Sequence, residues 1–136
     1  MEIEVRQVGE HRFVASNGRA TVNVGRKDAP DSFSPVELLL AAAAGCAAVT
    51  AESLVTRRTG GPVHARAADV RPEGAHQLDA VPVTLEFDAS GLDDDQLAVI
   101  RRAVEQLCTV TRTLKQGADA PLHLPPTPVQ TAVDPL

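Results

Sequence analysis

One long helix, with both of its ends marked in the sequence, constrains this fold more than any other feature. Ser34-Pro35-Val36-Glu37 combines a capping box with proline at the first helical position. Thr59-Gly60-Gly61 ends the helix, because glycine readily adopts the left-handed conformation found at helix C-termini. The sequence therefore predicts a helix from residue 35 to about Arg58, the dominant element of a 136-residue chain.

Segments on either side of this helix have the pattern of β-strands. They are residues 2–8, 12–16 and 20–24 before the helix, and 63–70 and 81–87 after it. Asn17-Gly18 between the second and third segments is a strong hairpin signal. Alternating apolar residues in 81–87 predict one buried and one solvated face, and Pro82 suggests an edge position or a strand start. We expect an α+β fold with antiparallel sheets packed against the long helix.

Two further helices are predicted near the C-terminus. Asp93, Asp94 and Asp95 place negative charge at a helix start, where the helix dipole favours it. An apolar stripe at spacings of three and four follows, formed by Leu97, Ile100, Val104 and Leu107. A short helix over 111–115 comes next. The proline-rich residues 125–136 are predicted to be a loose or edge-strand tail of a single domain spanning 1–136.

Charge and hydropathy narrow the range of partners and compartments. A net charge of −5 argues against a nucleic-acid partner, because such proteins usually carry a basic face. Residues 38–50 are the longest apolar stretch and are shorter than a spanning helix, so no membrane partner is expected. The N-terminal residues 1–6 are charged and alternating, unlike a signal peptide. The chain is expected to be cytoplasmic.

The two cysteines are the main candidates for chemistry. Cys46 lies within the long helix among alanines and Gly45, and Cys108 follows the second helix with Arg112 one turn on. In a reducing compartment a cysteine pair is more often catalytic or redox-active than a permanent staple. The thiolate is the reactive form, so a cation or another stabilising group must lie near a working thiol. The alternative is two buried, inert thiols that act as small hydrophobes.

Other chemical groups are poorly placed for a role at Cys46. Glu37 lies about 13 Å along the helix from Cys46 and on its opposite side, which favours a capping role. Ser53 shares the face of Cys46, although a solvated or backbone-bonded hydroxyl explains it as well. The four histidines do not cluster with a cysteine, and nucleotide-binding motifs are absent from the sequence. No cofactor or metal is expected.

Taken together, the two cysteine segments resemble the OsmC/Ohr family of thiol-dependent peroxidases. The resemblance rests on a Ser-Pro-x-Glu-Leu-Leu-Leu-Ala-Ala helix with Cys46 eleven residues after the proline, and on a distal Cys-x-Val-x-x-x-Leu segment beginning at Cys108. It implies an OsmC-like fold and an intertwined homodimer with active sites at the subunit interface. It also implies that Cys46 is the peroxidatic thiol and that Cys108 is the resolving thiol.

Two positions differ from the organic hydroperoxide reductase branch of that family. Val36 stands where that branch has glutamate, and Gly9-Glu10-His11-Arg12 stands near its Gly-Gly-Arg loop. The resemblance therefore implies the broader OsmC-like branch, with Arg12 as the nearest match to the arginine that pairs with the reacting thiol. Arg19 is the second candidate.

These features predict a cysteine-based peroxidase that acts on organic hydroperoxides or hydrogen peroxide. Cys46 would be oxidised to a sulfenic acid, Cys108 would condense with it, and a lipoyl or thioredoxin type of dithiol would reduce the disulfide. The alternative is a dimeric redox-sensing or small-molecule-binding protein with little turnover. The small side chains around Cys46 fit either an apolar substrate or close packing against a partner subunit.

Overall fold

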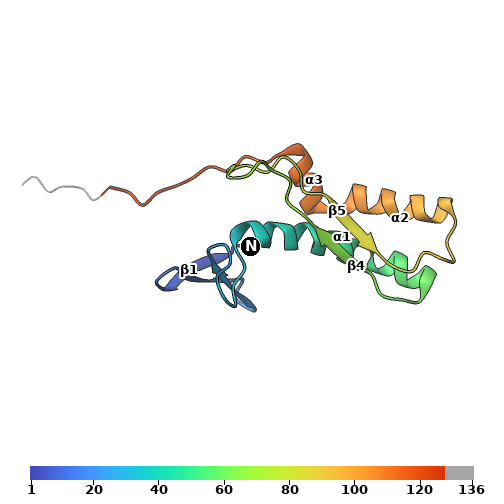
Figure 1. The fold of residues 1–136 in the computed structure, drawn as a ribbon, viewed down its shortest axis with the longest axis horizontal. Coiled ribbons are helices and arrows are strands. Elements are labelled where there is room, and N and C mark those ends of the chain that lie inside the picture. The colour runs from blue at the N-terminus through green and yellow to red at the C-terminus, as the bar shows by residue number, and fades with distance from the viewer. Residues whose placement is uncertain (128–136) are drawn as a thin grey trace, which may run out of the picture.

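The computed structural model of the protein describes residues 1–127, in which strands precede and follow one long helix (Figure 1). The elements in chain order are β1 (Glu4–Gly9), β2 (Arg12–Ser16), β3 (Thr21–Gly25), α1 (Pro35–Thr59), β4 (His64–Ala67), β5 (Val83–Glu86), α2 (Asp94–Leu107) and α3 (Thr109–Gln116). Both sheets are antiparallel. The structure thus confirms an α+β fold with antiparallel sheets and a long helix.

Helix α1 begins and ends where the sequence predicts. The Ser34 hydroxyl accepts a hydrogen bond from the Glu37 N–H at 3.2 Å, and the Ser34 N–H donates to Glu37 Oε1 at 2.8 Å. At the other end Gly60 has a φ of 71° and donates its N–H to the Thr56 carbonyl at 2.8 Å. A side chain at Gly60 would be strained in this conformation, so the glycine provides a defined helix stop.

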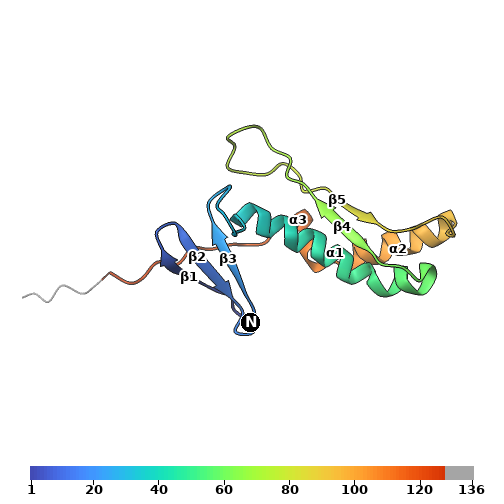
Figure 2. The same cartoon turned by 60° about the horizontal axis from the view of Figure 1, so that its bottom comes forward.

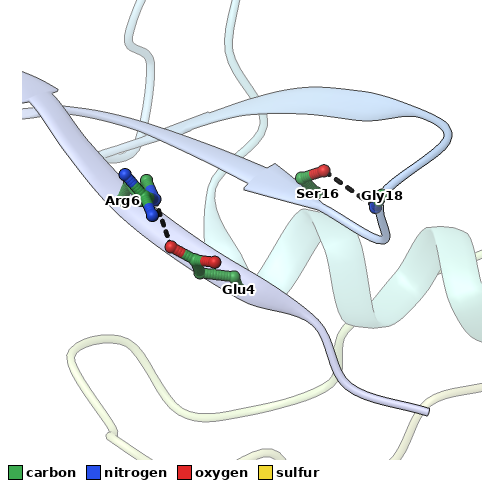
Figure 3. A network of polar contacts seen from close by, with 4 residues as sticks. All are labelled: Glu4, Arg6, Ser16 and Gly18. Carbon is green, nitrogen blue, oxygen red and sulfur yellow. Dashed lines mark hydrogen bonds and ion pairs between the residues drawn. The ribbon is translucent and has the colours of Figure 1, made fainter.

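Strands β1, β2 and β3 form a sheet beside the start of α1, with β1 on the side away from the helices (Figure 2). The β2–β3 hairpin closes at the pair Ser16 and Thr21, and the Gly18 N–H donates to Ser16 Oγ at 3.0 Å within its turn (Figure 3). An ion pair between Arg6 and Glu4 lies along β1. Only Ala15 and Val24 are buried apolar side chains in these strands, so the sheet lacks a substantial core of its own.

The remaining elements pack around α1. Strands β4 and β5 pair and lie against it, and α2 and α3 contact it as well (Figures 1 and 2). The buried cluster consists of Ala51 and Val55 from α1 and Ile100 from α2. Half-buried side chains around it are Leu54, Val63, Leu85, Phe87, Leu92 and Val104.

Two predictions about this region were wrong in detail. Leu107 is 67% exposed, although it continues the apolar stripe of α2. The stripe leaves the core there because α2 ends at Leu107 and the chain turns at Cys108. The strands β4 and β5 are also shorter than predicted. Beyond them the two segments are joined by a bond from the Ala68 N–H to the Pro82 carbonyl at 3.2 Å and by an isolated bridge between Val70 and Ala80.

Helix α1 is also more apolar over its length than expected. It has 25 residues and contains an 18-residue window with a mean hydropathy of 1.8, of which 22% is buried. By length and composition such a helix could cross a membrane, a property shared by core helices of globular proteins. The predicted apolar stretch at residues 38–50 is part of this longer window, because Ala51, Leu54 and Val55 continue the apolar character beyond residue 50.

After α3 the chain runs on without helix or strand to residue 127. Leu122 and Leu124 in this segment are 84% and 77% exposed. Of the predicted tail, residues 125–127 are irregular, and residues 128–136 lie outside the described part of the chain.

Candidate functional site

Cys46 occupies the middle of α1, at the margin of its buried face. That face is formed by Ala43, Ala47, Ala51 and Val55, which recur every four residues. Cys46 is half-buried between exposed Gly45 and buried Ala47. The Cys46 side chain is therefore more accessible to solvent than the buried side chains of the same helix.

Cys108 occupies the junction between α2 and α3. Its N–H donates to the Val104 carbonyl at 2.9 Å, which closes α2, and its carbonyl accepts from the Arg112 N–H at 3.0 Å, which opens α3. Its side chain is fully buried, with 0% exposure. The backbone on both sides thus holds Cys108 in place.

The fold brings these two distant cysteines together. Helix α1 packs against both α2 and α3, and the Cys46 thiol is close enough to Cys108 to be one of the groups that lower its pKa. Both thiols are free. The chain's two cysteines therefore form one thiol pair across α1 and the α2–α3 junction.

Opposing effects act on the Cys108 thiol. Burial raises its pKa, but the Thr111 hydroxyl, the Cys46 thiol and the backbone N–H groups of Thr111 and Val110 together lower the pKa below its ordinary value. The sulfur makes no capping hydrogen bond to α3, so these N–H groups act mainly as dipoles at the start of the helix. The buried thiol accordingly has groups around it that stabilise a thiolate.

The predicted arginines lie elsewhere in the subunit. Arg12 is an exposed residue at the start of β2, next to Gly9, and Arg19 is exposed in the β2–β3 turn. The sheet that carries them stands beyond the start of α1, whereas Cys46 is near the middle of that helix (Figure 2). A contact between Arg12 and Cys46 therefore stays a prediction that requires a second subunit.

The carboxylate closest in sequence to the expected glutamate position has another role. Val36 is half-buried, and Glu37 is exposed and bonded to Ser34. Hydrogen bonds from the Ser34 backbone and side chain hold the pKa of Glu37 below its usual value. This confirms the capping role of Glu37. Ser53 is exposed, on the solvated side of α1.

An open groove of about 1260 Å³ lies along α1, α2 and α3, and neither Cys46 nor Cys108 lines it. Its walls come from α1, the segment that leads into β5, α2 and α3, and Ala47 and Thr111 line it next to the two cysteines. Most of the lining is apolar; Arg101 and Lys115 add positive charge, and Asp79, Asp94 and Glu105 add negative charge. Within residues 1–127, no group of three or more His, Cys, Asp or Glu side chains is placed to hold a metal ion.

Comparison with known proteins identifies the family. The sequence model of the family described as OsmC-like protein matches residues 27–122. The chain belongs to the OsmC-like family. A relative from Mycobacterium tuberculosis (strain ATCC 25618 / H37Rv), itself an uncharacterised protein, is 36% identical to this OsmC-like protein over 133 residues. The match covers 90% of this chain and 95% of the relative.

Solved structures of low sequence identity share the OsmC-like fold. The OsmC-like protein from Mycoplasma pneumoniae matches with a TM-score of 0.68 and 17% identity, over 85% of this chain and 86% of that one. A candidate redox protein from Lactobacillus casei ATCC 334 matches with a TM-score of 0.57 and 22% identity, over 85% and 83% of the two chains. These matches agree with the family resemblance seen in the sequence.

Thr111 is a site residue that the sequence analysis missed. It lies beside Cys108 and lines the groove, and its hydroxyl is one of the groups that lower the Cys108 pKa. Its position, three residues after a cysteine at a helix start, was the available signal, because residues three apart share a helix face.

Proposed function

We propose that this OsmC-like protein is a thiol-dependent peroxidase that reduces organic hydroperoxides or hydrogen peroxide. The proposal rests on the thiol pair, in which Cys46 and Cys108 are both free and lie within interaction range. Cys46 is half-exposed and Cys108 is fully buried. Peroxide can therefore reach Cys46 first, which favours Cys46 as the peroxidatic thiol and Cys108 as the resolving thiol.

The reaction proceeds in balanced steps. The Cys46 thiolate attacks one oxygen of the hydroperoxide, the O–O bond breaks, and the leaving oxygen takes a proton to form an alcohol or water. Cys46 becomes a sulfenic acid. The Cys108 thiolate then attacks the Cys46 sulfur, the S–S bond forms, and the sulfenic oxygen leaves as water after accepting a proton. An external dithiol of the lipoyl or thioredoxin type reduces the disulfide and is itself oxidised.

The immediate surroundings of the pair suit this chemistry. The apolar groove beside Ala47 and Thr111 offers space for the organic part of a hydroperoxide. The groups that lower the pKa of Cys108 favour its thiolate at the resolving step. The chemistry needs no cofactor or metal, and a reducing cytoplasm would supply the dithiol.

A homodimer is part of this proposal. Val5 and Val8 of β1 and Ile3 just before it are between 55% and 60% exposed, and Val49 on α1 is 76% exposed. A second subunit packed over these side chains would bury them. Exchange of the sheet between two copies would cover them and would carry Arg12, or Arg19, toward the partner's thiol pair. Sedimentation of the protein at micromolar concentration tests this, and a stable monomer would contradict it.

Peroxidase kinetics test the catalytic proposal. Purified protein would be mixed with hydrogen peroxide or cumene hydroperoxide, with dihydrolipoamide or thioredoxin as reductant. We expect sustained peroxide consumption by the wild type, which Cys46→Ser abolishes. Cys108→Ser should still consume about one equivalent and then accumulate a sulfenic acid. Equal turnover by wild type and Cys46→Ser would refute the proposal.

A redox sensor with little turnover is the second candidate. Val36 replaces the glutamate of the reductase branch, and Glu37 is bonded to Ser34 at the start of α1, away from Cys46 in the middle of the helix, so neither side chain supplies a carboxylate beside the reacting thiol. A sensor would form the disulfide with one equivalent of peroxide and then stop, even with excess dithiol. The same kinetic traces therefore distinguish the two functions.

A further inference from the structure

Thr111 occupies a special position relative to Cys108. It lies one turn into α3, is half-buried, and donates its hydroxyl to the Cys108 carbonyl oxygen at 3.3 Å. Cys108 is the N-cap residue of α3 and Thr111 is the third residue of that helix, so the two side chains lie on the same side of the helix start. The Thr111 hydroxyl is also one of the groups that lower the pKa of Cys108. One hydroxyl thus faces two acceptors on the same cysteine.

A hydroxyl has a single proton and rotates to suit its surroundings. Beside a neutral thiol, the carbonyl oxygen is the better acceptor. Once the sulfur is ionised it becomes the stronger acceptor, because hydrogen bonds to charged groups are roughly twice as strong as neutral ones. The 3.3 Å bond to the carbonyl is long, so its loss on rotation costs little.

Most charged groups of α2 and α3 near the junction have partners of their own, while the exposed Lys115 of α3 lines the same groove as Thr111. From α1, the titratable group that faces the Cys108 sulfur is the Cys46 thiol. On α2, Glu105 pairs with Arg101 at 3.6 Å. On α3, the exposed Arg112 donates its guanidinium to the Gln106 carbonyl at 2.8 Å.

We propose that Thr111 is a positioning residue that stabilises the Cys108 thiolate by turning its hydroxyl from the Cys108 carbonyl oxygen to the Cys108 sulfur. In turnover this holds Cys108 ready to attack the Cys46 sulfenic acid, a role that rests on the proposed two-thiol function. The contact between hydroxyl and sulfur itself does not depend on that function.

Helix α3 contains its own control. Thr113 makes the same type of bond, from its hydroxyl to the Thr109 carbonyl at 2.7 Å, but it is exposed. Thr113→Val removes a hydroxyl from α3 without touching the thiol pair. Thr111→Val removes the hydroxyl beside Cys108 and conserves volume, and Thr111→Ser restores it.

The test is a pH titration of the reduced full-length protein with 13Cβ-labelled cysteine, followed by NMR. Cys46→Ser assigns the two signals. We expect the titration midpoint of Cys108 to rise in Thr111→Val and to match wild type in Thr111→Ser and Thr113→Val. Disulfide formation after one equivalent of peroxide should be about tenfold slower at neutral pH in Thr111→Val, as expected for loss of one hydrogen bond to a charged group.

An unchanged Cys108 midpoint in folded Thr111→Val would overturn the proposal. If Thr111→Val does not fold, the pair Thr111→Ser and Thr111→Ala carries the same comparison, because these variants differ only by the hydroxyl. A raised midpoint in a protein without peroxidase turnover would support the Thr111 assignment while refuting the proposed function. Sustained peroxidase turnover with an unchanged Cys108 midpoint in Thr111→Val would support the proposed function and refute the Thr111 assignment.

Discussion

Oxidation of the thiol pair should stabilise the protein strongly. A bond between Cys46 and Cys108 would close a loop that contains the C-terminal half of α1, both strands of the second sheet and all of α2. For a loop of about sixty residues, the chain-entropy model gives about 4 kcal/mol of stabilisation. With an unfolding entropy of about 0.3 kcal/mol/K for a chain of this size, Tm should rise by about 14 °C.

Thermal unfolding followed by circular dichroism measures this effect. Reduced protein and protein treated with one equivalent of peroxide would be compared at the same protein concentration, with mass spectrometry to confirm loss of two hydrogens. A non-reducing gel would show that the bond is within one chain. Cys46→Ser, treated in the same way, should melt at the same temperature before and after. An intrachain disulfide that leaves Tm within about 2 °C of the reduced form would refute the reasoning, because the native fold would then be strained by the bond.

Three other changes test the packing and capping of α1 by urea unfolding. Val55→Ala should lower the free energy of unfolding by about 2 kcal/mol, because two methyl groups are removed from a fully buried site. A decrease below about 0.5 kcal/mol would show that the site collapses around the smaller side chain or is not fully buried. Ser34→Ala should lower the free energy of unfolding by about 1 kcal/mol, because the N-cap hydrogen bond is lost. Ser32→Ala, two residues earlier and outside the cap, should change it little. The pKa of Glu37 is lowered on folding, so its contribution should be present above the ordinary pKa of 4.5 and lost as the pH falls through the lower folded value. The advantage of wild type over Glu37→Gln should therefore shrink between pH 7 and pH 3, and a constant difference would contradict this assignment.

The sequence predicted best what local chemistry determines. The limits of α1 follow from Ser34, Pro35 and Gly60, whose effects act within one turn of the chain. The capping box at Asp93 and Gln96 was detectable by the same logic, although only the negative charge there was used. The hairpin at Asn17-Gly18 was likewise predictable because its turn needs a residue with positive φ, and Gly18 has a φ of 90°.

What depends on distant parts of the chain was harder to predict. The exposure of Leu107 could not be seen from its spacing, because the spacing continues while α2 stops. That the two cysteines meet was inferred from the family resemblance and not from their own neighbours in sequence. The interaction of Thr111 with Cys108 also required the fold, since many threonines in short helices bond only to their own backbone, as Thr113 does.

The limited packing between the β1–β3 sheet and the rest of the chain has a consequence for folding kinetics. Helix α1 packs directly against β4, β5, α2 and α3, and all of these contacts lie within one chain. They can therefore form without a second copy of the protein. The N-terminal sheet, by contrast, gains little apolar burial until another surface covers it. Refolding should then show a fast phase independent of protein concentration, followed by a slower phase whose rate increases with concentration.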